Sequence, residues 1–330
     1  MGKSDTAVKI WLSDDRRFAD LFNGTVFGGK QVVMPEDLEK LDRETDIIIT
    51  DKRASTKGLQ RHRDIVKQWK HGTFLAVLAC EAQDKVHYAM PVRNMLHDSL
   101  TYTEQIRKTW QKHPGQHLTG EEYLSRFRKK DRIFPVITLV FYYDLKKWDG
   151  AMDLYDMFHF DDVSEEETEE INILRTYLPN YRINLIDAGN VENINRFHTD
   201  LQQIFGVLQY RGQKDELRNY MLNNSSYFSQ VDLETYYALQ AFLHSEKMFK
   251  KVEIPDQKER INMCQAIEDI YKDGKKAGIK TGIKTGIKEG RTSLITQMLQ
   301  NGLPVSEIRK YTDATDEEIS NAEQAVHGTK

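Results

Sequence analysis

Cysteine is scarce in this 330-residue chain, which contains only Cys80 and Cys264. Neither belongs to a Cys-x-x-Cys pair, so the sequence predicts neither a disulfide framework nor a thiolate zinc site. We expect a reducing compartment, the cytoplasm, since no basic stretch followed by an apolar stretch opens the chain. A continuous apolar run long enough to span a bilayer is also missing, and we therefore expect no membrane association.

Several catalytic motifs are missing as well. The ten histidines form no His-Glu-x-x-His pair, and no Gly-x-Ser-x-Gly nucleophile motif occurs. The Gly28-Gly29-Lys30 sequence lacks the spacing of a phosphate-binding loop. His87 and His97 fit a place at the surface or on a helix face better than they fit metal ligation. These absences argue against zinc proteases, P-loop nucleotide hydrolases and serine hydrolases.

Charge is unevenly distributed, although the net charge is only −4. Residues 52–70 contain seven Lys/Arg and one acid, and residues 105–132 contain eight Lys/Arg and three acids. Residues 161–170, in contrast, are almost wholly acidic. A protein that binds phosphate needs a local positive surface more than a positive total charge. The basic stretches therefore indicate either a phosphate-binding surface or ordinary solvated faces.

Hydrophobic periodicity predicts a mixed fold. We expect a helix at residues 14–23 and a long helix that begins near Pro91. β-Rich runs predict strands at residues 46–50, 61–69, 74–83, 133–143 and 182–186, with a hairpin turn at residues 71–72. Helices take over from about residue 190. The fold class is α/β or α+β, with a helical C-terminal half.

The hairpin brings two acids together. If its loop has two to four residues, facing positions have numbers that sum to about 143 to 145, and Asp64 and Glu81 sum to 145. Their Cβ atoms would lie roughly 5 to 8 Å apart. Gln83 follows Glu81 by two residues and so points to the same face of the sheet.

A cation between the two carboxylates is one explanation for this pair. Like charges this close raise each other's pKa and weaken the sheet unless a cation lies between them. A hard ion such as Mg²⁺ suits an oxygen-only site, with water and substrate phosphate as its other ligands. The alternative is that both acids face solvent at the strand ends and are neighbours by chance.

The same residues resemble a known nuclease superfamily. An Asp at the start of one strand, followed by Glu-x-Lys/Gln at the end of the next, is the signature of the PD-(D/E)xK nucleases. More narrowly, the chain resembles the Rpn family of recombination-promoting nucleases, also described as transposases. The resemblance is carried in order by residues 63–66, 81–83 and 87–93, residues 141–143 with Trp148, and the Gly-Ile-Lys repeats of the tail. It therefore covers nearly the whole chain.

The resemblance implies a fold, an activity and metal ligands. The fold would be restriction-endonuclease-like, with a mixed sheet flanked by helices. The activity would be endonucleolytic hydrolysis of DNA phosphodiesters, with Mg²⁺, or Mn²⁺ or Ca²⁺, as the metal. Asp64 and Glu81 would be metal ligands, and the Ala82 carbonyl a possible third. The first helix of the superfamily often adds an acid, for which Asp15 fits best and Asp20 is the alternative. Asp46 is a competing ligand.

Gln83 departs from the common pattern. It takes the position where the superfamily more often has Lys, and an amide can neither supply a positive charge nor deprotonate water. Ala19, likewise, stands in the first helix where relatives tend to have Lys. We expect Lys67, Lys70 or Arg93 to supply the charge, and these three with Arg61 and Arg63 to contact DNA. The alternative is an inactive member of the fold that binds nucleic acid or a protein.

The tail contains a four-residue repeat, Gly-Ile-Lys-Thr, over residues 278–290. On a helix such a repeat gives parallel rows of Gly, Ile and Lys, and each Gly costs roughly 1 kcal/mol against Ala. We expect this helix to pair with that of a second copy, giving a homo-oligomer, most simply a dimer; the alternative is a flexible basic linker.

Beyond the repeat, three short helical segments resemble a helix-turn-helix module. Acids at residues 316–318 would repel DNA phosphate from the third segment, so we expect it to contact protein instead. The sequence thus divides into a nuclease-like core (1–160), an acidic segment with an additional core strand (161–190), a helical region (191–273), and a repeat helix with its helix-turn-helix-like tail (274–330).

Overall fold

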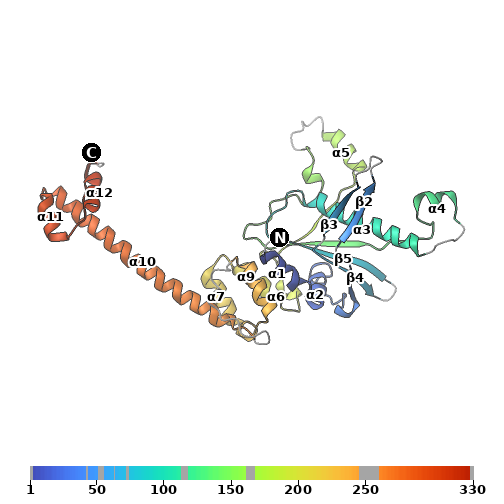
Figure 1. Ribbon diagram of the computed structural model, residues 1–330, viewed down its shortest axis with the longest axis horizontal. Coiled ribbons are helices and arrows are strands. Elements are labelled where there is room, and N and C mark those ends of the chain that lie inside the picture. Colours follow the sequence, from blue (N-terminus) through green and yellow to red (C-terminus); the bar gives the residue numbers. More distant parts are fainter. Residues whose placement is uncertain are drawn as a thin grey trace. The chain divides into compact units, whose positions relative to one another are not determined.

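The computed structural model describes residues 3–41, 44–50, 56–62, 64–71, 74–112, 118–160, 168–244 and 260–327 (Figure 1). The chain forms two compact units, Met1–Cys264 and Gln265–Lys330. The first contains the sheet and most of the helices. The second contains the greater part of the long repeat helix and the two helices that follow it.

The first unit is built on a five-stranded mixed sheet in the order β1-β4-β5-β6-β7. β1 pairs antiparallel with β4 and β4 antiparallel with β5, whereas β5, β6 and β7 run parallel. A second, two-stranded sheet joins β2 to β3. The strands are β1 (Leu38–Lys40), β2 (Glu44–Thr50), β3 (Thr56–His62), β4 (Ile65–His71), β5 (Phe74–Gln83), β6 (Val136–Tyr142) and β7 (Asn184–Asp187).

Helices surround the sheet and form the C-terminal part of the chain. In the first unit they are α1 (Lys3–Leu12), α2 (Asp15–Thr25), α3 (Met90–Gln111), α4 (Gly120–Ser125), α5 (Thr168–Tyr177), α6 (Leu201–Tyr210), α7 (Lys214–Asn223), α8 (Ser225–Phe228) and α9 (Leu233–Phe242). The long helix α10 (Met263–Gln300) begins there and continues into the second unit, where α11 (Val305–Thr312) and α12 (Asp316–His327) follow.

One face of the sheet packs against α1, α2, α6 and α9. The ring of Phe141 lies 6.0 Å from Phe205 of α6 and 6.1 Å from Phe242 of α9. Trp11 of α1 makes an edge contact with Phe242 at 5.6 Å. These aromatic side chains are fully buried and so supply much of the apolar area that holds the helices on the sheet.

The opposite face is covered by α3, which connects β5 to β6 (Figure 1). Pro91 occupies the first turn of this helix, where a missing N–H costs nothing. The Asp98 carboxylate accepts a hydrogen bond from Thr138 Oγ1 of β6 at 2.7 Å and from the Tyr181 hydroxyl at 2.5 Å. α3 is thereby fixed against the parallel half of the sheet.

The expected α/β core and the helical C-terminal region are confirmed. The strand predicted at residues 61–69 is instead divided between β3 and β4, which belong to different sheets. Asp64 lies at the division, and its side chain bonds across to β5. The helix α1 is an addition that the sequence patterns did not predict.

The repeat of the tail is helical and lies within α10. The first of the three short helical segments expected beyond the repeat is instead the end of the same helix, which stops where Gly302 adopts a φ of 79°. α12 begins with a capping box, in which the Thr315 N–H donates to Glu318 at 2.9 Å and the Glu318 N–H donates to Thr315 Oγ1 at 3.3 Å. No helix among the described residues combines the length and apolar character needed to cross a membrane.

Candidate functional site

The register of the β4–β5 hairpin determines the geometry of the candidate site. Ile65 pairs with Cys80 and His71 with Phe74, so facing residue numbers sum to 145, as predicted. Asp64 immediately precedes β4, one residue beyond the last pair of the ladder, and its side chain accepts a hydrogen bond from the Ala82 N–H, next to Glu81. The predicted register of the hairpin is therefore confirmed, and the two acids are close enough that the charge of Glu81 raises the pKa of Asp64.

Asp64 is buried and has two partners. Its residue exposure is 4%. Oδ1 forms an ion pair with Lys9 Nζ of α1 at 2.8 Å, and Oδ2 accepts a hydrogen bond from the Ala82 N–H at 2.9 Å. The ammonium and the backbone amide both stabilise the charged carboxylate.

Glu81 is fully buried beneath α3. Oε2 lies 3.3 Å from the Arg93 guanidinium, and Oε1 lies 3.2 Å from His97 Nδ1. Arg93 and His97 are four residues apart and so lie on the same side of the helix. α3 thus places a cation and an imidazole on the second acid of the pair.

Burial and mutual repulsion dominate the electrostatics of the site. Burial, followed by the charge of Glu81, raises the pKa of Asp64 to about 6, although Lys9 acts in the opposite direction. Burial also raises the pKa of the Cys80 thiol, with further contributions from Asp64 and Glu81. Negative charge is therefore held here at a cost in free energy, and an additional cation would relieve it.

Asn94 is a further polar side chain on this part of α3. It is fully buried, and neither atom of its amide has a hydrogen-bond partner among the described residues. It is adjacent to Arg93 and three residues before His97, on the face of the helix that meets the sheet. A buried amide without a partner is unfavourable, and a water or ligand oxygen would satisfy it.

The donors at the site fit a hard divalent cation that retains much of its hydration. Asp64 and Glu81 offer only carboxylate oxygens, and Mg²⁺ commonly uses one or two carboxylates with waters and phosphate. Each carboxylate has about four acceptor positions, of which the contacts above use two per group. No cluster of three or more His, Cys, Asp or Glu capable of holding a metal occurs in the described parts of the chain.

Asp15 and Lys67 form a separate pair on α2 and β4. The Lys67 side chain is 1% exposed, and its Nζ lies 2.5 Å from Asp15 Oδ1 and 2.7 Å from the Ser13 carbonyl oxygen. It also lies 4.7 Å from the centre of the Phe18 ring. Burial lowers the pKa of Lys67. Because these contacts are with α2, the structure does not bring either residue into the contacts of Asp64 and Glu81.

Asp20, the alternative acid of the same helix, has a structural position. Its carboxylate accepts hydrogen bonds from the backbone N–H groups of His198 and Thr199, the latter at 2.7 Å. It also accepts one from the Thr199 hydroxyl at 2.6 Å. Asp20 thus holds the segment before α6 against α2.

The remaining candidates are dispersed. Lys70 is partly exposed and pairs with Glu39 of β1 at 2.5 Å. Gln83 ends β5 and is half-buried, while its carbonyl accepts from the Tyr143 N–H at 3.1 Å. The side chains of Asp46 and Arg61, and all of Arg63, lie outside the described residues. Of the three cations expected to replace the missing lysine, Arg93 is the one whose contacts reach the acid pair.

The sequence patterns did not predict α1, and therefore they did not identify Lys9, which lies on this helix. Val8, Trp11 and Leu12 are fully buried, which gives α1 an apolar face. Lys9 follows Val8 directly and is itself only 9% exposed. A lysine flanking the apolar face of a short helix was the available signal, since such a side chain needs a buried anion. His97 was assigned a helix face, but its contact with Glu81 was not anticipated.

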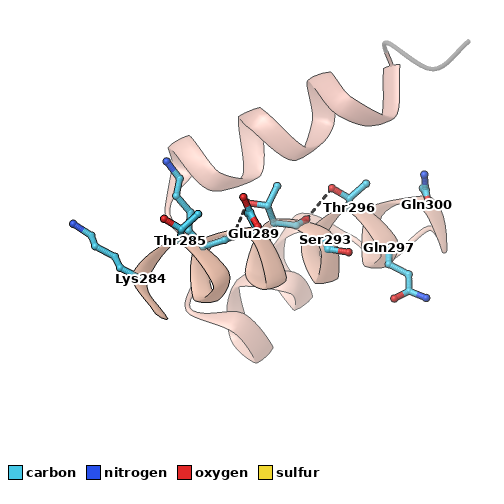
Figure 2. A pocket seen from close by; sticks show the side chains of 9 residues that line it. Lys284, Thr285, Glu289, Ser293, Thr296, Gln297 and Gln300 are labelled. Carbon is cyan, nitrogen blue, oxygen red and sulfur yellow. Dashed lines mark hydrogen bonds between the residues drawn. The ribbon is translucent and has the colours of Figure 1, made fainter. Parts of the chain in front are cut away.

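The second unit contains a groove that is unrelated to these acids. Its volume is about 920 Å³, and Figure 2 shows polar side chains along one side of α10. The hydroxyls of Thr292 and Thr296 donate to carbonyls one turn earlier, at 2.9 and 2.8 Å. The lining contains a single acid, Glu289, so the groove lacks the paired carboxylates of the first unit.

Comparison of the chain with protein-family models, with curated proteins and with solved structures finds no match.

The raised pKa of Asp64 gives a testable pH dependence. A folded-state pKa of about 6, above an unfolded value near 3.9, means that the folded state binds more protons between these pH values. The free energy of unfolding contributed by Asp64 therefore falls as the pH rises from about 4 to about 6, by at most about 1.4 kcal/mol per pH unit. We therefore expect the difference in free energy of unfolding between wild type and Asp64→Asn, measured by urea denaturation, to fall over this pH range.

Asp149→Asn is the matched control. Asp149 is a surface acid whose pKa is lowered by its hydrogen bond to Lys146. Its contribution has the opposite sign, because it stabilises the folded state above the unfolded pKa and is lost in acid. If the free energies of unfolding of wild type and Asp64→Asn changed in parallel with pH, the raised pKa of Asp64 would be contradicted.

Proposed function

We propose that this protein is a metal-dependent DNA endonuclease that hydrolyses phosphodiester bonds, of the recombination-promoting or transposase-like type. The observation that carries the proposal is the buried Asp64–Glu81 pair at the end of a β-hairpin, bounded by Lys9 and Arg93. Two adjacent buried acids seldom have a purely structural role, because the repulsion between them and their burial both oppose folding. Functional sites commonly retain unfavourable arrangements of this kind.

The fold supports this proposal at the level of architecture. We infer a restriction-endonuclease-like core, with the mixed sheet flanked by helices on both faces. The two acids then lie in the antiparallel hairpin, and α3 leads from it into the parallel strands. Shared architecture does not by itself establish chemistry, so the proposal depends on the acid pair.

Asp64 and Glu81 would hold the metal, with the Ala82 carbonyl as the third protein ligand. Mg²⁺, or Mn²⁺ or Ca²⁺ in its place, would supply neutralisation of the pair, activation of water and stabilisation of negative charge on phosphate. Asn94 is positioned on the same helix as Arg93 and His97, and its amide is available to orient a water or a phosphate oxygen.

Lys9 and Arg93 would provide the charge that Gln83 lacks. Each contacts one member of the acid pair, and Arg93 is partly exposed, so its guanidinium can also face a bound phosphate. The His97 imidazole, with Nδ1 at 3.2 Å from Glu81 Oε1, holds that carboxylate in place. Arg61, Arg63 and Lys70 remain candidates for contact with the DNA backbone, whereas Lys67 is 1% exposed and bound to Asp15, so it is no longer one.

The alternative is an inactive protein of the same fold that binds nucleic acid or a protein. One structural observation favours it. Every carboxylate oxygen of the pair already has a partner in the chain, and Lys9 neutralises Asp64 without a metal. Together with Gln83 in place of a lysine, this arrangement is the one expected of an active site that has lost its catalytic activity.

A nuclease assay distinguishes the two functions. Wild type is expected to nick plasmid DNA in Mg²⁺ or Mn²⁺, whereas Asp64→Asn and Glu81→Gln should lose at least about 100-fold in rate because each removes a metal ligand. Lys9→Met should reduce the rate by about tenfold or more, since Gln83 supplies no charge. The rate of strand cleavage at pH 7.5 is the measurement.

Asp149→Asn, which alters only surface contacts with Lys146 and Tyr88, is the control and should cleave as wild type does. Equal cleavage by wild type, Asp64→Asn and Glu81→Gln would exclude this active site. DNA binding without cleavage by any form would favour the inactive alternative.

We also propose that the protein forms a homo-oligomer, most simply a dimer, through α10. Ile279, Ile283 and Ile287 recur every fourth residue and are 54%, 58% and 64% exposed. A Cβ atom added at Gly278, Gly282, Gly286 or Gly290 would meet no atom within 4 Å. A row of exposed isoleucines beside an open glycine row gives a surface that a second helix can approach closely.

Charged substitutions in the isoleucine row test this association. Ile283→Lys with Ile287→Lys should convert oligomers to monomers in light scattering, because two ammonium groups would have to be buried at the interface. Thr281→Lys with Thr285→Lys adds the same charge outside the isoleucine row and should leave the mass unchanged. A wild-type protein that is monomeric at micromolar concentration would refute the proposal.

A further inference from the structure

Residues 118–134, between α3 and β6, form a basic lobe. Figure 1 shows its helix α4 beyond the C-terminal end of α3, away from the sheet. Tyr123 and Leu124 on this helix are 73% and 87% exposed. Residues 126–132 contain five Lys/Arg and one acid. The lobe therefore presents an aromatic ring and an aliphatic side chain next to a concentration of positive charge.

The lobe is folded by its own polar contacts. Thr119 and Glu122 form a capping box at the start of α4, and the helix ends where Arg126 adopts a left-handed conformation with a φ of 53°. Glu122 Oε1 accepts from the Lys129 N–H at 3.2 Å. Asp131 Oδ2 accepts from the Arg128 N–H at 2.9 Å. Two of the three acids are thus bound to backbone amides rather than to basic side chains.

The basic side chains consequently keep their charge available. Within the described parts of the chain, no carboxylate forms an ion pair with Arg126, Lys129, Lys130 or Arg132. All four residues are exposed. The Arg132 guanidinium donates only to the carbonyl oxygens of Lys129 and Asp131, which do not neutralise it. Cations held without local counter-charges attract an external polyanion.

α3 sets the distance between the lobe and the acid pair. The base of the lobe is fixed to this helix by two hydrogen bonds between Gln105 and Phe134, at 2.7 and 3.1 Å. From Arg93 to Gln105 the helix advances about 18 Å. That length corresponds to about five base pairs of duplex DNA.

We propose that the basic lobe binds the phosphate backbone of duplex DNA, at least about five base pairs from the Asp64–Glu81 pair. The location of this contact relative to cleavage rests on the proposed nuclease function, whereas the binding itself does not. Lys129, Lys130 and Arg132 contact phosphates, and Tyr123 and Leu124 pack against the sugars at the edge of a groove. The lobe increases affinity and lengthens the bound segment of DNA without reading its sequence.

Two features favour DNA over an anionic membrane. The most exposed apolar side chains of the lobe are the two on the six-residue helix α4, and Ile133 and Phe134 are less exposed, at 38% and 37%. This is far less than the extended apolar face of a helix that binds to lipid. The cations, in contrast, follow one another along an irregular segment, where they can meet successive phosphates.

The salt dependence of DNA binding tests the proposal directly. The probe is a fluorescent duplex of roughly 20 base pairs, long enough to span both sites, and EDTA prevents cleavage. Lys130→Gln should lower the magnitude of the slope of log K against log salt concentration by about 0.9, and Lys129→Gln with Lys130→Gln by about 1.8. The double variant should weaken binding about tenfold at low salt.

Lys214→Gln provides the matched control. Lys214 is the first residue of α7, is exposed, and has no carboxylate partner among the described residues. Its substitution should leave both the affinity and the slope unchanged.

Several outcomes would overturn the proposal. Unchanged slopes in both lysine variants would exclude phosphate contacts by the lobe, even if the protein cleaves DNA. If the lysine variants lost binding to phosphatidylserine vesicles but still bound DNA as wild type does, the lobe would be a membrane-binding surface instead. Lobe-dependent binding by a protein that does not cleave DNA would confirm the contact while refuting the nuclease function, so the two failures remain distinguishable.

Discussion

The register of the β4–β5 hairpin is the constraint on which the candidate site depends. Because Ile65 faces Cys80, Asp64 is placed next to Glu81 at the end of the hairpin, and a shift of one residue would move every side chain of one strand to the other face. The apolar side chains of Val66, Val77 and Ala79 pack together and so oppose such a shift. Core packing therefore maintains an electrostatically unfavourable pair of acids.

The surroundings of the pair show how the fold tolerates it. α1 contributes Lys9 to Asp64, and α3 contributes Arg93 and His97 to Glu81, so each acid is served by a helix from a different part of the sequence. Burial of the pair still raises the pKa of Asp64 to about 6. The partners thus reduce the repulsion without removing it, which leaves a driving force for binding a further cation.

Much of this arrangement could be predicted from local sequence, and the remainder required the tertiary fold. The β5 strand and the facing acids follow from apolar patterning and a short turn, which are local properties. Lys9 and His97 reach the acids only because α1 and α3 pack against the sheet. The division of β3 from β4 was missed because an unbroken run of strand-like residues does not show which sheet each half joins. Asp15 was a reasonable third acid by position, but its contact with Lys67 depends on how α2 packs.

The central claim, that Asp64 and Glu81 form a divalent-cation site, is tested most directly by isothermal titration calorimetry with Mn²⁺ at pH 7.5. Wild type is expected to bind one ion per chain and to bind it about fourfold more weakly at pH 5.5, where protons compete for Asp64. Glu81→Gln should abolish this binding, while Asp149→Asn should preserve it. Equal Mn²⁺ affinity in wild type and Glu81→Gln, or an affinity that does not change with pH, would contradict the account.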